Sequence, residues 1–150
     1  MNAMGDIVVG YQTDPVNGIR SAAMWKRTGN TWSNTQLLGY VPGTVPSYGI
    51  NVCEGVSGDG QIAVGYCTFA GDPFSTTGFV WTPTTGVQDV NQFLADRGIL
   101  PNPSFTIRTL SDVSPDGRQI IGNGQDLVAP YTKRTFMIRL GNTVDVAATG

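Results

Sequence analysis

One sequence pattern recurs three times along this chain of 150 residues, and it constrains the fold more than any other feature. The clearest copy is residues 57–66 (SGDGQIAVGY), and residues 114–122 (SPDGRQIIG) form a second. Residues 5–11 (GDIVVGY) form a third copy that is cut at its front. The last glycine of the pattern recurs at intervals of 55 and 57 residues, at Gly10, Gly65 and Gly122. A landmark kept at such a period indicates a repeat protein.

A second landmark follows each copy and keeps the same period. It recurs at intervals of 56 and 57 residues, at Trp25, Trp81 and Ile138. The repeat therefore divides the chain into units of approximately 5–49, 50–104 and 105–147. Twenty glycines and nine prolines place turn signals at short intervals, which suits many short strands.

The sequence predicts an all-β fold in which each unit of about 56 residues holds about four short antiparallel strands. Those are the dimensions of a β-propeller blade, and propellers usually close with at least ~4 blades. We therefore expect a partial propeller from a longer array, or one closed by oligomerisation. A β-sandwich or β-prism is the alternative. Two further expectations are a surface loop over residues 69–77 and a short helix over residues 91–97 that ends at Gly98.

Composition excludes several classes of function. The net charge is −2 and only 13% of residues are charged, so no basic cluster predicts nucleic-acid binding. The chain has no histidine, which removes the commonest general base and metal ligand. We expect no cofactor, no metal and no catalytic residue. No apolar run approaches the roughly 20 residues of a membrane helix, and the first residues carry no signal-peptide pattern.

The aspartate–glycine pairs of the repeated pattern predict tight turns. Asp59 and Asp116 precede Gly60 and Gly117. An aspartate in such a turn caps backbone N–H groups, and the glycine takes a positive φ. Calcium ligation or carboxylate catalysis is the alternative, but each turn offers only one carboxylate and a calcium loop needs several oxygen ligands.

Cys53 and Cys67 flank the turn of the second unit. A hairpin centred near Asp59 would place them across from each other within a residue or two. We therefore predict a disulfide, which would contribute about 3 kcal/mol in the chain-entropy model. A bond would agree with an extracytoplasmic location. The alternative is two free, buried thiols.

Three segments of the second unit resemble the bacterial extracellular HAF repeats. They are residues 56–65 (VSGDGQIAVG), 78–82 (GFVWT) and 86–91 (GVQDVN), and residues 134–140 resemble a terminal copy. The resemblance covers about residues 5–146. It implies a secreted or surface-displayed location and no defined activity. Met4 departs from the family pattern, because it stands where the other units have aspartate.

The leading functional hypothesis is a non-enzymatic structural or binding module of a secreted or surface-displayed bacterial repeat protein. Its partners would be neighbouring repeats, a second copy of the chain, or a glycan or other surface ligand. The interaction surface would be the loops over residues 12–18, 41–48 and 69–77, since loops carry most binding residues.

Two alternatives stay open. A carbohydrate-binding module would use the aromatic residues Trp32, Tyr40 and Tyr48, whereas Trp25 and Trp81 are expected to pack in the core. A propeller-type glycoside hydrolase is less favoured, and it would use the carboxylates Asp14, Glu54 and Asp72.

Overall fold

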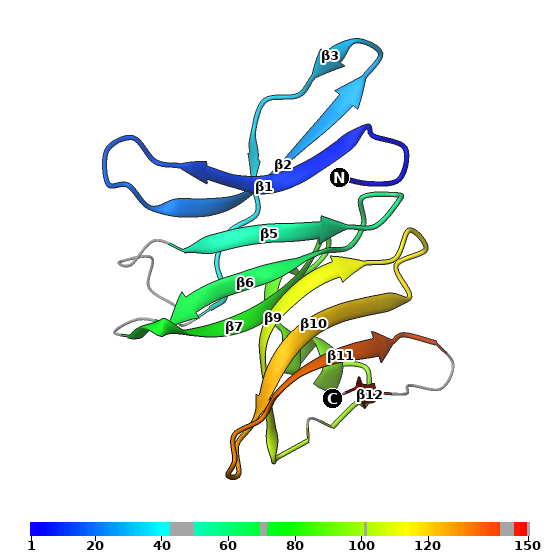
Figure 1. The fold of residues 1–150 in the computed structure, drawn as a ribbon. Helices are drawn as coiled ribbons and strands as arrows, with labels where there is room; N and C mark the ends of the chain where they lie inside the picture. Colours follow the sequence, from blue (N-terminus) through cyan, green and yellow to red (C-terminus); the bar gives the residue numbers. More distant parts are fainter. Residues whose placement is uncertain (43–49, 70–71, 101, 142–145, 150) are drawn as a thin grey trace.

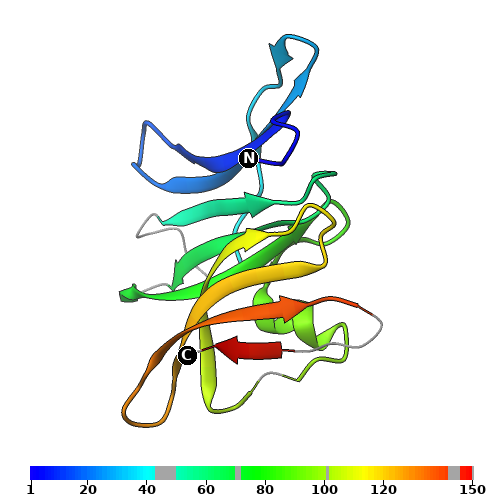
Figure 2. The ribbon, with the colours of Figure 1, turned by 45° about the vertical axis from the view of Figure 1, so that its right-hand side comes forward.

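Three antiparallel sheets follow one another along the chain, which confirms the predicted all-β class. The computed structural model describes residues 1–42, 50–69, 72–100, 102–141 and 146–149. The sheets are stacked in chain order, with the N-terminus at the first sheet and the C-terminus at the third (Figures 1 and 2). Each sheet is an open path of neighbouring strands, and none closes on itself among the described residues.

Each sheet is a run of sequential strands. The first sheet contains β1 (Ile7–Thr13), β2 (Arg20–Thr28), β3 (Thr31–Trp32) and β4 (Gln36–Leu37). The second contains β5 (Asn51–Val56), β6 (Ala63–Phe69), β7 (Asp72–Thr82) and β8 (Gly86–Asp89). The third contains β9 (Phe105–Val113), β10 (Gln119–Asp126), β11 (Lys133–Arg139) and β12 (Val146–Thr149). Consecutive strands pair in the second and third sheets, whereas β3 and β4 both pair with β2.

The landmark glycines align the three sheets strand by strand. Gly10 lies in β1, Gly65 in β6 and Gly122 in β10. The strands β5 and β9, which precede β6 and β10, therefore have no counterpart in the described part of the first sheet. The short pair β3 and β4 stands where the second sheet has β8.

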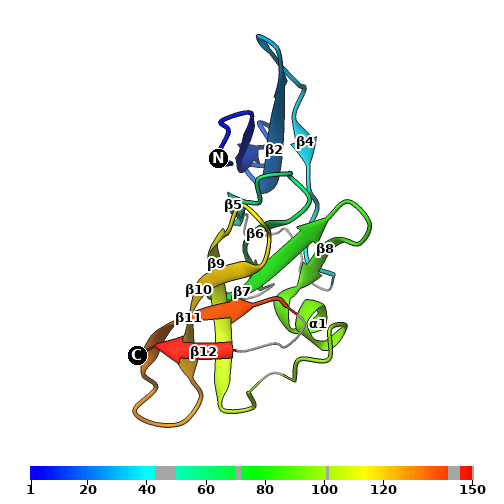
Figure 3. The same cartoon turned by 90° about the vertical axis from the view of Figure 1, so that its right-hand side faces the viewer.

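Two local predictions have different outcomes. The short helix is confirmed as α1 (Val90–Ala95), which packs beside β7 and β8 (Figure 3). Asp89 caps its first turn, and Gly98 follows it with a φ of +74°. The prediction of a loop over residues 69–77 is wrong, because β7 begins at Asp72. Cross-strand pairs such as Cys67 with Thr77 continue the β6–β7 ladder through that stretch.

Apolar residues fill both spaces between the sheets. Ile7, Ala22 and Met24 of the first sheet pack with Phe79 and Trp81 of the second. On the other side, the second sheet packs against the third through residues that include Val64, Val80, Leu110, Phe136 and Ile138. The second sheet is thus covered on both faces.

Candidate functional site

The repeated pattern forms the same turn in all three sheets. Ser57 Oγ accepts a hydrogen bond from Ile62 N at 3.0 Å, and Ser114 Oγ accepts one from Gln119 N at 2.9 Å. In the first sheet Asn2 Oδ1 takes this role and accepts from Ile7 N at 3.0 Å. The glycines of the three turns have φ values of +71°, +71° and +72°, at Gly5, Gly60 and Gly117. The first copy is therefore a complete turn in which asparagine replaces serine.

The two aspartates stabilise their own turns. Ser57 Oγ donates to Asp59 Oδ1 at 2.7 Å, and Gln61 N donates to the same oxygen at 3.0 Å. Asp116 has the equivalent bonds from the Ser114 hydroxyl and its own turn backbone. These donors, the serine hydroxyl first, lower the pKa of both carboxyl groups below the usual value of 3.8. One oxygen of each carboxylate, Oδ1, is thus engaged within the turn, in agreement with a structural role.

The three turns are linked to one another at one side of the stack (Figure 1). Asn2 Nδ2 donates to the carbonyl oxygen of Gly58 at 3.0 Å, and Gly58 N donates to the carbonyl oxygen of Pro115 at 2.8 Å. The turn glycines of the second and third sheets also pack against a side chain from the preceding sheet. A Cβ at Gly60 would lie 2.6 Å from Cδ1 of Ile7, and one at Gly117 would lie 3.1 Å from Cδ1 of Ile62. The packing at the glycine therefore repeats from sheet to sheet, whereas the hydrogen bond comes from a side chain at the first link and from the backbone at the second.

The face of the third sheet that points away from the second sheet carries exposed polar residues, although Ile121 is also exposed there. Gln119 is exposed and occupies the position of Ile7 and Ile62. Asn123 and Thr135, on neighbouring strands, are also exposed. The position that packs against the next sheet in the first two sheets is therefore polar and exposed in the third.

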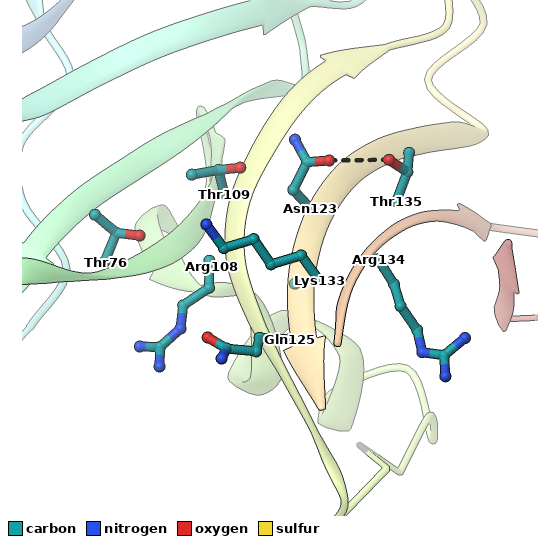
Figure 4. A pocket seen from close by; sticks show the side chains of 9 residues that line it. Thr76, Arg108, Thr109, Asn123, Gln125, Lys133, Arg134 and Thr135 are labelled. Atoms are coloured by element: carbon teal, nitrogen blue, oxygen red, sulfur yellow. Dashed lines mark hydrogen bonds between the residues drawn. The ribbon is translucent and has the colours of Figure 1, made fainter. Parts of the chain in front are cut away.

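A polar hollow of about 480 Å³ lies on this part of the third sheet (Figure 4). Thr135 Oγ1 donates to Asn123 Oδ1 at 3.0 Å across its wall. Arg134 is held by Asp126 through an ion pair of 2.9 Å, whereas Arg108 and Lys133 form no ion pair with another described residue. The described lining carries three cations and no carboxylate: Thr76, Arg108, Thr109, Asn123, Gly124, Gln125, Lys133, Arg134 and Thr135. Such a lining suits an oxyanion or a polyhydroxylated acid.

The aromatic residues expected to bind sugar do not form one platform. Trp32 is 44% exposed and lies 5.7 Å from the Arg27 guanidinium. Tyr40 is half-buried, and its hydroxyl bonds to Ser21 Oγ. Arg27 and Ser21 are six residues apart on β2, a distance of about 20 Å along a strand. Tyr48 lies outside the described residues.

The two repeat-position tryptophans lie in and beside the core. Trp81 is 6% exposed and packs between the first and second sheets. Trp25 is half-buried on the opposite face of the first sheet, and its Nε1 donates to Thr35 Oγ1 at 3.1 Å. The difference arises because no described sheet covers the outer face of the first one.

The three carboxylates considered for hydrolysis lie on separate elements. Asp14 lies between β1 and β2, where its carboxylate accepts from Val16 N at 2.8 Å. Glu54 is exposed in the irregular part of β5, and Asp72 is the first residue of β7. No described contact brings two of them together.

The predicted disulfide between Cys53 and Cys67 is wrong, and both cysteines are free and buried. Cys53 lies opposite Gly65 and Cys67 opposite Asn51, so the two are diagonal neighbours. Diagonal residues lie about 7–8 Å apart, whereas disulfides span roughly 4.4–6.8 Å between Cα atoms. The thiols instead donate to Val64 O at 3.4 Å and to Asn51 Oδ1 at 3.1 Å.

Sequence reasoning missed two features that the sequence nevertheless carries. Asn2 stands at the serine position of the turn, and an asparagine oxygen can accept the same backbone hydrogen bond. Gln119, Asn123 and Gln125 lie on one face of β10 together with the exposed Ile121, so three of the four residues at that period are polar. The hollow itself was not predictable, because its lining also draws on β7, β9 and β11.

The described residues show neither a metal-binding cluster nor a membrane-spanning helix. They hold no group of three or more cysteine, aspartate or glutamate side chains placed to bind a metal ion. Within those same ranges, no helix has the length and apolar character needed to cross a membrane.

Comparisons of the chain with protein-family models, with curated proteins and with solved structures find no match.

Proposed function

We propose that this chain is a non-enzymatic structural module: three consecutive propeller-type blades of a secreted or surface-displayed bacterial repeat protein of the HAF type. One observation carries the proposal. The same turn is built three times, and a hydrogen bond joins each turn to the next, from Asn2 to Gly58 and from Gly58 to Pro115. A module of this kind serves to stack with neighbouring β units and to display its loops.

The packing between the sheets supports the blade assignment. β5 contacts β1 and β2, and β9 contacts β6 and β7 in the same way. The first strand of each later unit thus packs on the two strands of the preceding unit that carry its landmark residues. Repetition of one interface along the chain is what a blade array requires.

Equilibrium unfolding in urea tests the structural part of the proposal. Because each sheet buries its apolar face only against a neighbour, the three sheets should unfold in a single transition, monitored by circular dichroism and by tryptophan fluorescence. Met24→Ala, between the first and second sheets, and Val64→Ala, between the second and third, should each lower the midpoint of that transition. Separate transitions for the two interfaces would contradict the proposal.

The non-enzymatic part is tested separately. Incubation with a panel of aryl glycosides should give no turnover above that of buffer. Hydrolysis that is lost in Glu54→Gln and retained in Asp59→Asn would contradict this assignment, because Glu54 is exposed and Asp59 is engaged in its turn.

A second candidate function is binding of an acidic carbohydrate in the polar hollow of the third sheet. The observation that favours it is the combination of Arg108 and Lys133 with amide and hydroxyl groups, and the described part of the lining holds no carboxylate. An array of uronic-acid and sulfated glycans should then show binding that Lys133→Ala weakens. Arg118→Ala is the matched control, since Arg118 is exposed and does not line the hollow. Equal binding by both variants would exclude this site.

A further inference from the structure

The strand β1 has one free edge where its counterparts are paired on both sides. β6 pairs with β5 and β7, and β10 pairs with β9 and β11. Among the described residues β1 pairs only with β2. An unpaired edge presents a row of backbone N–H and C=O groups that can bind a further strand.

The landmark glycine shows that this edge is shaped for a strand. A Cβ at Gly65 would overlap the carbonyl oxygen of Val52 in β5, and one at Gly122 would overlap that of Thr109 in β9. At Gly10 the nearest atom is Cζ3 of Trp25, at 3.8 Å. None of the three glycines has a positive φ, so conformation does not require glycine there. The space beside Gly10 is therefore open, and it corresponds to the space that β5 fills beside Gly65 and β9 fills beside Gly122.

The turn before β1 directs the chain along the same edge. Asn2 N donates to Ile7 O at 2.9 Å, as Ser57 N donates to Ile62 O at 2.8 Å and Ser114 N to Gln119 O at 2.8 Å. In the second and third sheets, the residues that lead into these serines are β5 and β9. A segment that leads into Asn2 is thus aimed at the free edge of β1.

We propose that the edge of β1 is a strand-acceptor site for one extended segment joined to Asn2, bound antiparallel as β5 is to β6 and β9 is to β10. This inference deepens the proposed function and rests on it. The two strands that already fill such sites define the chemistry of the segment. Each has a buried apolar residue opposite the glycine, Cys53 or Leu110, and a buried valine just before the turn, Val56 or Val113. Between these residues both strands have an irregularity in register.

A strand graft on the full chain tests the proposal. A copy of residues 107–113 (IRTLSDV), the part of β9 that leads into Ser114, is inserted between Met1 and Asn2. Hydrogen exchange by mass spectrometry is then followed over residues 7–13. The graft should slow exchange of this segment at least about tenfold, because edge amides gain partners. A matched graft, with proline at the positions copied from Arg108 and Leu110, should leave exchange unchanged, because proline has no N–H.

Gly10→Ala provides the second arm. In the ungrafted chain the added methyl group has room, so exchange and thermal midpoint should stay as in the wild type. In the grafted chain the same methyl group should abolish the protection, because the neighbouring carbonyl would overlap it. Protection that survives Gly10→Ala would show that the graft does not pair in the proposed register, and would overturn the proposal.

Three further outcomes decide the remaining cases. Equal exchange in the active and proline grafts overturns the proposal. Concentration-dependent protection of residues 7–13 in the ungrafted chain also overturns it, because a second copy would then occupy the edge.

If the grafted chain does not fold, a synthetic peptide of residues 104–113 is added to the wild-type chain instead. Protection of residues 7–13 supports the site, and none at millimolar peptide overturns it. A single unfolding transition of the ungrafted chain in urea supports the proposed structural module whatever the result of the graft, so the two proposals can fail separately.

Discussion

The backbone N–H of Gly58 donates a hydrogen bond of 2.8 Å to the carbonyl oxygen of Pro115, and this bond joins the turns of the second and third sheets. The carbonyl of the same Gly58 accepts from Asn2 Nδ2 of the first sheet. Gly58 therefore connects both neighbours of the middle sheet. Pro115, its equivalent in the third sheet, has no N–H with which to continue this chain of bonds.

We predict that Gly58→Ala destabilises the whole chain. A Cβ at this position would lie 2.9 Å from Pro115 O and would push the two turns apart. The expected loss is about 1–3 kcal/mol in the free energy of unfolding, measured in urea. Pro115→Ala is the control, because it keeps the accepting carbonyl; its effect should stay within about 0.5 kcal/mol. An equal loss in the two variants would show that the link contributes nothing specific.

The two thiols should behave as buried, reduced groups. Burial raises the pKa of Cys53 to about 12 and that of Cys67 to about 11, so neither is a thiolate at neutral pH. Ellman's reagent should therefore react slowly with the native protein and should titrate both thiols once the protein is unfolded without reductant. Dithiothreitol should leave the thermal midpoint unchanged. If the chain unfolded without reductant shows no titratable thiols, the cysteines form a disulfide and the prediction of free thiols is wrong.

Acid should weaken the turns. The pKa values of Asp59 and Asp116 are lower in the folded state than their usual value of 3.8. The stabilisation by their charged forms is therefore present above the unfolded pKa and is lost as the pH falls through the folded pKa, that is, below about pH 4. A double variant, Asp59→Asn with Asp116→Asn, should show a shallower fall of the thermal midpoint between about pH 5 and pH 2 than the wild type. Parallel curves would mean that the carboxylates do not stabilise the turns.

Periodicity predicted the repeat and the all-β class, because both depend on local pattern. Gly60 and Gly117 take positive φ, as aspartate–glycine turns require, and the helix ends before Gly98. Residues 61–68 carry apolar side chains on both faces, a pattern typical of a strand buried on both sides, and Ala63 and Val64 are fully buried.

Register and long-range contacts were not predictable in the same way. The disulfide prediction had the two cysteines within a residue or two of each other across the hairpin, whereas the irregular pairing near Gly55 leaves them diagonal. Trp32 and Tyr40 are close in sequence, yet they contact opposite ends of β2. The polar hollow draws on strands of two sheets, and no local pattern specifies that meeting.

Alanine substitution of the landmark glycines, one at a time and followed by urea unfolding, tests whether these glycines serve the packing of the repeated strands. If the glycines serve close approach of a preceding strand, Gly65→Ala and Gly122→Ala should each cost about 2 kcal/mol or more, because their Cβ atoms would overlap a strand carbonyl. Gly10→Ala should change the free energy of unfolding by less than about 0.5 kcal/mol, because its site is open. Equal losses at all three positions, or no loss at any of them, would show that the glycines do not serve the close approach of a preceding strand.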